Sequence, residues 1–329
     1  MRLGPLSLEN RYVLAPMLNV STAPYRRFCR KLQKIGLVSV PMLYAKKIEK
    51  YSSSIEKDLC KIEEERPISV QIIGSDPLAL KKSIKYLESY NFDILDLNAG
   101  CPSKRAIRAH EGGYLMKDLD KLSLLLSIMN KYSSRPISLK IRTGFDKSIN
   151  PKKLANIIND SEIDLLTVHA RTVMSKFYDN KLDLETVKIL KENLSMPVIG
   201  NGNISNPTSA KAFIDFTNVD AFMIGRESMG NPEIFSQIHD YLVNKKLILF
   251  RNDIETMEKY FGLFEQCVDE FLDGMSHPLG NNNVKFIELK RNAIWLSKNI
   301  NKSTKLRITL SKAKNLDQLK EILYNYFNS

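Results

Sequence analysis

Eight short apolar segments recur in the first 225 residues, and this repeat constrains the fold more than any other feature of the sequence. They cover residues 12–17, 38–42, 68–73, 94–98, 137–142, 165–169, 198–201 and 221–225. Amphipathic stretches separate most of them, at 78–89, 119–132, 151–159, 184–193 and 207–216. Alternating strands and helices favour a parallel sheet with right-handed crossovers. Eight such units predict an α/β protein with a (β/α)₈ TIM barrel.

A doubly wound sheet is the alternative fold, but the sequence has no G-x-G-x-x-G or G-x-x-x-x-G-K-[ST] loop. After His239 the pattern changes, because residues 245–329 contain no convincing strand and read as several helices. We therefore expect a barrel over residues 1–240, followed by a smaller all-helical C-terminal domain over residues 245–329.

The basic residues are distributed unevenly. The chain has 49 Lys and Arg against 37 Asp and Glu, a formal net charge of +12. The stretch from Met275 to Lys314 contains nine basic residues and a single acidic one, Glu288. This stretch is either a solvated helical face or a surface that contacts phosphates.

Cysteine spacing and hydropathy narrow the class of protein. The four cysteines form no C-x-x-C pair, so neither a disulfide scaffold nor a metal site is expected. No apolar run approaches the roughly 18 residues that a membrane span needs, and no signal-peptide pattern opens the chain. We expect a cytoplasmic protein without a membrane partner, and a monomer.

Glycines follow the last two predicted strands. Barrels often bind phosphate at these two loops, through backbone N–H groups and a helix N-terminus. Gly200, Gly202 and Gly225 permit close backbone approach, and Arg226 could add a charged hydrogen bond. The alternative is that these glycines only make tight turns.

Three side chains at other strand ends are candidates for chemistry. Lys140 lies in an apolar strand, where an ammonium group must either be paired in the barrel interior or serve a function, such as stabilising negative charge on a reduced flavin. Cys101 follows a strand in an Asn-x-Gly-Cys-Pro sequence and suits a proton donor. It could instead be a buried small hydrophobe. His169, beside Arg171, is a candidate flavin or phosphate ligand.

Together these motifs resemble the tRNA-dihydrouridine synthases. The resemblance rests on Leu-Asn-Ala-Gly-Cys-Pro at 97–102, Lys-Ile-Arg-Thr-Gly at 140–144 and His-Ala-Arg-Thr at 169–172. Leu-Ala-Pro-Met at 14–17, Val-Gln at 70–71, Gly-Asn-Gly at 200–202 and Gly-Arg-Glu at 225–227 complete it. It extends in order from residue 10 to about residue 237.

The resemblance implies an FMN-dependent enzyme that reduces a uridine in tRNA to 5,6-dihydrouridine with NADPH or NADH. Flavin N5 would deliver hydride to uracil C6, Cys101 would protonate C5, and Asn98 would hold the uracil. Arg142 and Arg171 are further substrate candidates, and the basic domain would bind tRNA through Lys285, Lys290 and Arg291. The implied FMN contacts are Pro16, Met17, Leu18, Gln71, Lys140, His169, Asn201, Gly202, Asn203, Gly225 and Arg226.

The chain departs from the family pattern at Ser175, usually glutamine, and at Asn203, often acidic. The loop at 18–22 is also atypical. Two other classes stay open: a small-molecule flavoenzyme similar to dihydroorotate dehydrogenases, and a catalytically silent RNA-binding protein. The basic C-terminal stretch argues against the first class, and the presence of Cys101 and Lys140 argues against the second.

Overall fold

The structure is a computed structural model that describes residues 2–3, 6–32, 35–51, 55–175, 181–274, 280–298, 300 and 303–328. Its internal contacts divide the chain into two compact units. The first unit comprises Met1–Ser21 and Lys34–Ile224, and the second comprises Thr22–Gln33 and Gly225–Ser329.

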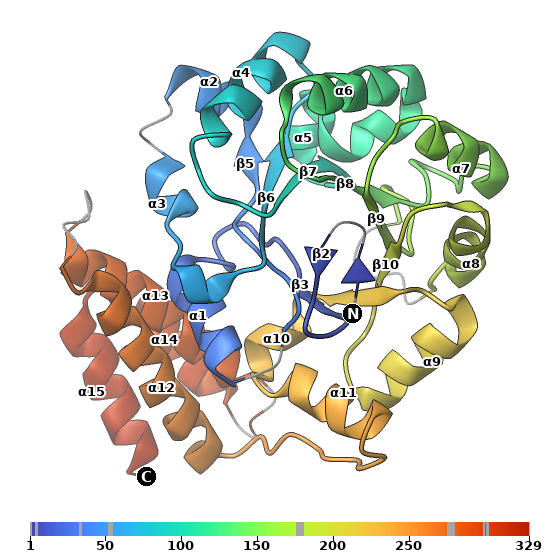
Figure 1. Ribbon diagram of the computed structural model, residues 1–329. Helices are drawn as coiled ribbons and strands as arrows, with labels where there is room; N and C mark the ends of the chain where they lie inside the picture. Colours follow the sequence, from blue (N-terminus) through green and yellow to red (C-terminus); the bar gives the residue numbers. More distant parts are fainter. Residues whose placement is uncertain are drawn as a thin grey trace. The chain divides into compact units, whose positions relative to one another are not determined.

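The first unit is a nearly closed barrel of eight parallel strands, in the order β3-β11-β10-β9-β8-β7-β6-β4 (Figure 1). A parallel bridge joins Val13 to Leu37, which brings the first strand back beside the chain that enters β4. The predicted TIM barrel is confirmed. The eight strands are β3 (Tyr12–Leu14), β4 (Val38–Ser39), β6 (Ile68–Ile73), β7 (Ile94–Ala99), β8 (Ile137–Arg142), β9 (Leu165–His169), β10 (Val198–Asn201) and β11 (Ala221–Ile224).

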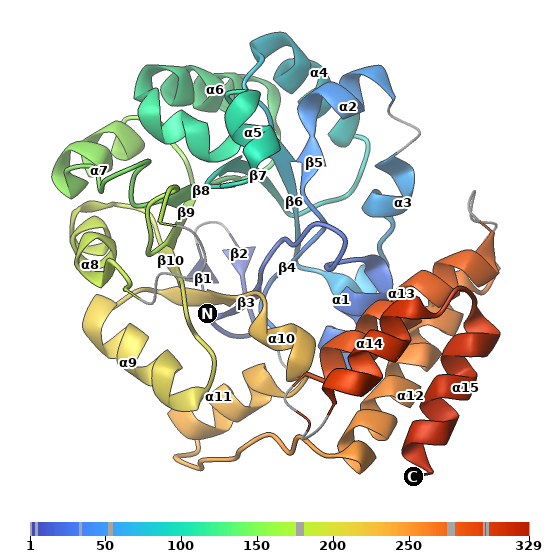
Figure 2. The same ribbon diagram turned by 180° about the vertical axis from the view of Figure 1, so that it is seen from behind.

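Helices surround this barrel, and most of them connect one strand to the next (Figures 1 and 2). Asn150 and Asp183 accept hydrogen bonds from the first-turn amides of α7 and α8, which explains why these two helices begin where the sequence predicts. The helices of this unit are α2 (Ala45–Lys50), α3 (Glu56–Leu59), α4 (Pro77–Leu87), α5 (Lys104–Arg108), α6 (Leu119–Tyr132), α7 (Pro151–Asn159), α8 (Leu184–Asn193) and α9 (Pro207–Thr217), with short 3-10 helices η2 (Glu63–Glu65) and η3 (Gly112–Lys117).

Three short strands were not expected from the sequence. β1 (Arg2–Leu3) and β2 (Leu6–Ser7) pair as an antiparallel hairpin, and β5 (Leu43–Tyr44) adds to β6. Leu8, just after the hairpin, packs with Ile94 and Leu165, the first residues of β7 and β9. The amino ends of these strands are therefore closed by apolar side chains, which leaves polar side chains to gather toward the carboxyl ends.

The first predicted strand is shorter than expected. β3 ends at Leu14, although the sequence favoured a strand to Met17. Pro16 has no N–H to donate to a strand ladder. The Met17 carbonyl accepts the amides of Val20 and Ser21, so the chain turns at this point.

The second unit contains only helices among its described residues. Ala23–Leu32 (α1) belongs here because Phe28 packs edge-on against Phe264, with ring centroids 5.3 Å apart. Lys31 also pairs with Glu270 at 2.6 Å. The other helices are α10 (Glu227–Gly230), α11 (Ile234–Leu242), α12 (Ile254–Leu272), α13 (Asn281–Leu296), α14 (Thr304–Lys312) and α15 (Leu316–Phe327). The all-helical C-terminal part is thus confirmed, while a functional boundary between residues 240 and 245 stays a prediction.

All four cysteines are free thiols, and Cys29 and Cys267 are buried. Among the described residues, no helix is both long enough and apolar enough to cross a bilayer. Within the same residues, no group of three or more His, Cys, Asp or Glu side chains is arranged to hold a metal ion.

Candidate active site

Polar side chains alternate with apolar ones along the strands of the barrel. In β7, Asp96 and Asn98 share one face, because successive side chains of a strand point to opposite sides. The strand register places Asp96 opposite Gln71 of β6 and Ser138 of β8. Asn98 lies opposite Lys140 of β8. The parallel pairing therefore brings these polar side chains of three neighbouring strands together.

A buried chain of hydrogen bonds links these side chains. Both carboxylate oxygens of Asp96 accept hydrogen bonds, one from Ser138 Oγ and the other from Gln71 Nε2 at 2.5 Å. Asn98 Nδ2 donates to Gln71 Oε1 at 2.8 Å. Because an ionised carboxylate can only accept, Asp96 fixes which end of the Gln71 amide faces Asn98.

The chain ends on the backbone of the Cys101 loop. Asn98 Oδ1 accepts the amides of Gly100 and Cys101, at 3.0 and 2.8 Å. The Cys101 thiol is half-buried and lies 3.5 Å from Ser103 Oγ. Asp96 thus orients Gln71, Gln71 orients Asn98, and Asn98 holds the thiol-bearing loop.

Lys140 is half-buried beside this chain. Burial, reinforced by the positive charge of Arg142, lowers the pKa of the Lys140 ammonium group to about 8. Burial also raises the pKa of the Asp96 carboxyl group. No carboxylate of the described residues lies within 4.0 Å of Lys140 Nζ, so the interior salt bridge that the sequence left open is not formed there.

β9 and β10 contribute a second group of side chains. Arg171 is buried, with Nη1 at 3.3 Å from His169 Nε2 and Nη2 donating to Asn203 Oδ1 at 2.9 Å. Gly202 has φ +140°, and a Cβ there would come within 3.1 Å of Leu182 and 3.4 Å of the His169 ring. Glycine at this position keeps the space beside His169 open. The Asn201 side chain is tied to the Met223 carbonyl at 2.8 Å.

The remaining sequence candidates lie in other local settings. Pro16 and Met17 are half-buried and Leu18 is exposed, in the turn after β3. Arg142 is buried and donates to the Thr172 carbonyl at 2.7 Å. Gly225 and Arg226 follow β11 directly, and contacts assign them to the second unit.

The three predicted tRNA contacts on α13 all have partners within the second unit. Lys285 pairs with Glu265 and Asp269, at 2.9 and 2.6 Å. Lys290 donates to the Ala313 carbonyl at 2.7 Å. Arg291 pairs with Glu288 at 3.0 Å. Elsewhere in the basic stretch Lys305, Lys312 and Lys314 are exposed and make no ion pair with described residues, while Lys302 lies outside the described residues.

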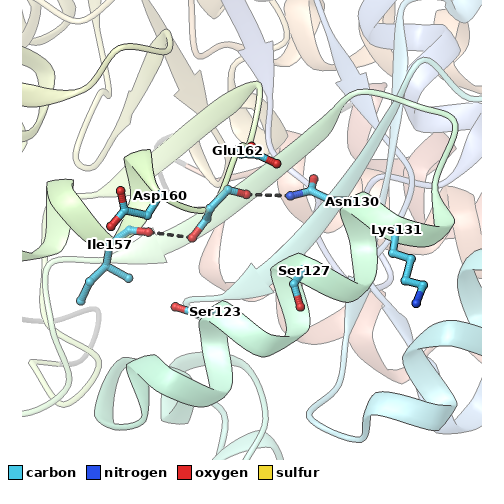
Figure 3. A pocket seen from close by; sticks show the side chains of 8 residues that line it. Ser123, Ser127, Asn130, Lys131, Ile157, Asp160 and Glu162 are labelled. Atoms are coloured by element: carbon cyan, nitrogen blue, oxygen red, sulfur yellow. Dashed lines mark hydrogen bonds between the residues drawn. The ribbon is translucent and has the colours of Figure 1, made fainter.

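A hollow of about 590 Å³ lies away from these strand ends, between α6 and the end of α7 (Figure 3). Its walls include no candidate site residue. Asn130 Nδ2 donates to the Ser161 carbonyl at 2.7 Å, across the hollow. The lining residues are Ser123, Ser127, Asn130, Lys131, Ile157, Asp160, Ser161 and Glu162.

Comparison with known proteins identifies the family. The family model for dihydrouridine synthase (Dus) matches residues 13–329. The chain belongs to the dihydrouridine synthase family. Conversion of uridine to dihydrouridine is a reduction, so this member is an oxidoreductase. The resemblance inferred from the sequence motifs is therefore confirmed.

Several curated members of the dihydrouridine synthase family cover most of the chain. A tRNA-dihydrouridine synthase B of Pasteurella multocida is 32% identical over 81% of this chain and 83% of its own length. The Pseudomonas aeruginosa protein of the same name is 35% identical, over 73% and 72%. That of Escherichia coli K12 is 32% identical, over 75% and 77%.

A solved structure shares the fold of this dihydrouridine synthase. Morphinone reductase matches with a TM-score of 0.53 at 11% identity, covering 78% of this chain and 91% of its own. At that identity the likeness supports the barrel fold and nothing further.

Sequence reasoning missed two residues of the buried chain, Asp96 and Ser138. One signal was available for Asp96, because an acidic residue two positions before Asn98 in an otherwise apolar strand must share its face.

Proposed function

We propose that the protein is an FMN-dependent tRNA-dihydrouridine synthase that reduces one uridine of a tRNA with NADPH or NADH. One observation carries the proposal: the chain from Asp96 to Asn98 fixes the Cys101 loop next to Lys140, an ammonium group without a carboxylate partner among the described residues. Because tRNA is the proposed substrate, the cytoplasm remains the expected location, and a monomer the expected state.

The residues of the barrel suit a flavin. Lys140 could donate a charged hydrogen bond to an electron-rich ring atom, and the open space at Gly202 would admit an anionic group beside His169. Gln71 and the turn at Pro16, Met17 and Leu18 are the other proposed contacts of the ring. Asn201, Asn203, Gly225 and Arg226 are the remaining proposed FMN contacts. When bound, FMN would supply the hydride that NADPH or NADH brings.

The side chains of the protein would orient the uracil and supply the proton. Asn98 would orient the uracil, and the Cys101 thiol would give its proton to the ring carbon on the side away from the hydride. Arg142 and Arg171 are proposed to bind the tRNA substrate. The uridine must leave its stack to reach a barrel, which costs a few kcal/mol, and phosphate contacts of the basic stretch would offset that cost.

Two measurements test this function. Denatured protein should release FMN, and a strain lacking the gene should lose dihydrouridine from its tRNA. Release of no flavin, or of FAD, would contradict the cofactor assignment. Bound FMN with unchanged tRNA dihydrouridine would favour the small-molecule flavoenzyme, and flavin-free protein that binds tRNA would favour the silent binder.

FMN affinity should depend on pH through Lys140. The group is charged below its pKa of about 8, so its contact with FMN is present at lower pH and is lost as the pH rises through 8. We expect the affinity of the apoprotein for FMN to fall by about 10-fold across this range, the lower end for one charged hydrogen bond. Titration by flavin fluorescence measures it.

Two Lys140 variants serve as controls. In Lys140→Arg the charge persists to high pH, so the decline should be absent. In Lys140→Met affinity should be weaker but flat with pH. An identical decline in all three proteins would exclude Lys140 as its source.

The exposed lysines of α14 are the sharper test of the tRNA surface, because Lys285, Lys290 and Arg291 also hold the second unit together. Charge reversal at Lys305 and Lys312 should weaken tRNA binding and lower the slope of log affinity against log salt by about one for each lost phosphate contact. NADPH oxidation should be unchanged. The control reverses Lys85 and Lys131, two exposed lysines of α4 and α6. Equal slopes for the two double variants would place the RNA elsewhere.

A further inference from the structure

An aromatic and basic surface adjoins the Cys101 loop. α5 begins three residues after Cys101, and η3 packs on α5 and β7. The Gly113 amide donates to the Cys101 carbonyl at 3.0 Å. A Cβ at Gly112 would lie 2.9 Å from Cys101 Cβ. In both ribbon views α5 lies close to β7 (Figures 1 and 2). The start of η3 is therefore held directly against the proposed proton donor.

His110 forms the outer part of this surface. Its ring stacks on Tyr114, with centroids 4.1 Å apart and planes at 13°. His110 is exposed, so part of the imidazole that Tyr114 does not cover reaches solvent. Its backbone is left-handed, with φ 55°, and its amide donates to the Ile107 carbonyl at 3.1 Å. The turn thus presents a flat aromatic face rather than a loose side chain.

Further contacts support the stack from below. Tyr114 packs edge-on against Phe145, with centroids 6.1 Å apart, and Lys117 Nζ lies 4.2 Å from the centre of the Phe145 ring. We call His110, Tyr114, Phe145 and Lys117 the His110 ledge. Such a platform costs little entropy when a planar group stacks on it, because its rings are already packed.

The charge around the ledge is positive. Residues 104–117 contain four Lys or Arg and one acid, Glu111, which is only 5% exposed. The four basic side chains of this segment are exposed. The Arg105 guanidinium lies 3.8 Å from the centre of the Tyr44 ring, and Tyr44 and Cys101 pack on the same apolar cluster. The opposing surface charges are Asp118 and Asp120, which follow this segment, and Asp146, which lies near Lys117.

We propose that the His110 ledge stacks on the base of a nucleotide that adjoins the reduced uridine, while the cations of α5 contact its phosphates. This rests on the proposed function. A uridine that leaves its stack uncovers a face of each neighbouring base, and single-stranded RNA bases stack on His and Tyr rings. The ledge offers such a ring directly beside Cys101, with positive charge around it for the phosphates.

His110→Asn removes the ring and keeps the turn, because asparagine tolerates left-handed backbone. The variant should raise the KM for tRNA roughly 10- to 100-fold, the effect of one stacked base. Flavin reduction by NADPH should be unchanged. The control is Phe216→Ser in α9, an aromatic ring with 47% exposure and a lysine 5.7 Å from its centre. An unchanged KM in His110→Asn, or an equal rise in Phe216→Ser, would overturn the proposal.

Abasic tRNAs sharpen the test. Two substrates each lack the base on one side of the target uridine. On one of them, the KM of the wild-type protein should rise by the same factor as the KM of His110→Asn rises on intact tRNA. On that same abasic substrate, the KM of His110→Asn should rise no further. Additive losses on both substrates would contradict the ledge. Failure of the wild-type protein to reduce intact tRNA would contradict the proposed function instead.

Discussion

Cys101→Ala is expected to slow the reaction with tRNA by about 10²–10⁴-fold, the usual contribution of a general acid, without affecting flavin reduction by NADPH. The thiol lies on a loop whose backbone accepts or donates three hydrogen bonds, two with the Asn98 side chain and one with the Gly113 amide, so alanine should preserve the loop and remove only the proton. Stopped-flow kinetics of each half-reaction measure the two effects separately.

Two variants complete the Cys101 experiment. Cys101→Ser should restore little of the rate of the reaction with tRNA, since a hydroxyl is a far weaker acid than a thiol. Cys60→Ala is the matched control, because Cys60 is also half-buried and its thiol donates to the Glu56 carbonyl at 3.4 Å. Reoxidation of reduced flavin by tRNA at the normal rate in Cys101→Ala would remove the thiol from the mechanism and leave it a structural role.

Asp96→Leu is expected to reduce turnover by roughly 10²-fold, the cost of a small misplacement of reacting groups. Without the carboxylate, the Gln71 amide can turn and stop orienting Asn98 and the Cys101 loop. The variant also leaves buried donors unsatisfied, which should lower the free energy of unfolding by about 1–3 kcal/mol. Turnover per folded molecule and denaturant unfolding measure the two effects.

Asp96→Asn should lose much less turnover than Asp96→Leu, because its amide oxygen can still accept a hydrogen bond from Gln71. Ser138→Ala removes the other donor to Asp96 and should leave turnover close to that of the wild-type protein. A folded Asp96→Leu protein with normal kcat and KM would show that Asp96 does not position the site. Equal loss in Asp96→Asn and Asp96→Leu would also contradict the orienting role.

Local signals explain which elements the sequence could predict. α7 begins after Asn150, whose side chain accepts the Lys152 amide at 3.1 Å, and its bounds match the expected range of 151–159. Such caps act within one turn and are legible in the sequence. The grouping of α1 with the second unit depends instead on Phe28 meeting residues more than 200 positions away. Nothing local encodes that contact.

In the site, too, some features follow from local sequence and others from contacts between distant segments. Strand-end positions were enough to single out Cys101 and Lys140, the family resemblance added Asn98, and the structure brings these three residues together. The order in which side chains meet across strands depends on register, which pairs Gln71 with Asp96 and is not visible in either strand alone. The internal pairing of Lys285 depends likewise on the packing of α13 against α12.

We expect this chain, with FMN bound, to reduce a uridine of tRNA. The most direct measurement incubates purified protein with NADPH and tRNA that lacks dihydrouridine, then quantifies nucleosides by mass spectrometry. Wild-type protein should form one dihydrouridine for each NADPH oxidised, after the NADPH oxidised without tRNA is subtracted. Each tRNA should gain one dihydrouridine, and Cys101→Ala should form almost none. Bound FMN and NADPH oxidation with no dihydrouridine in any tRNA of the source organism would contradict the proposed function.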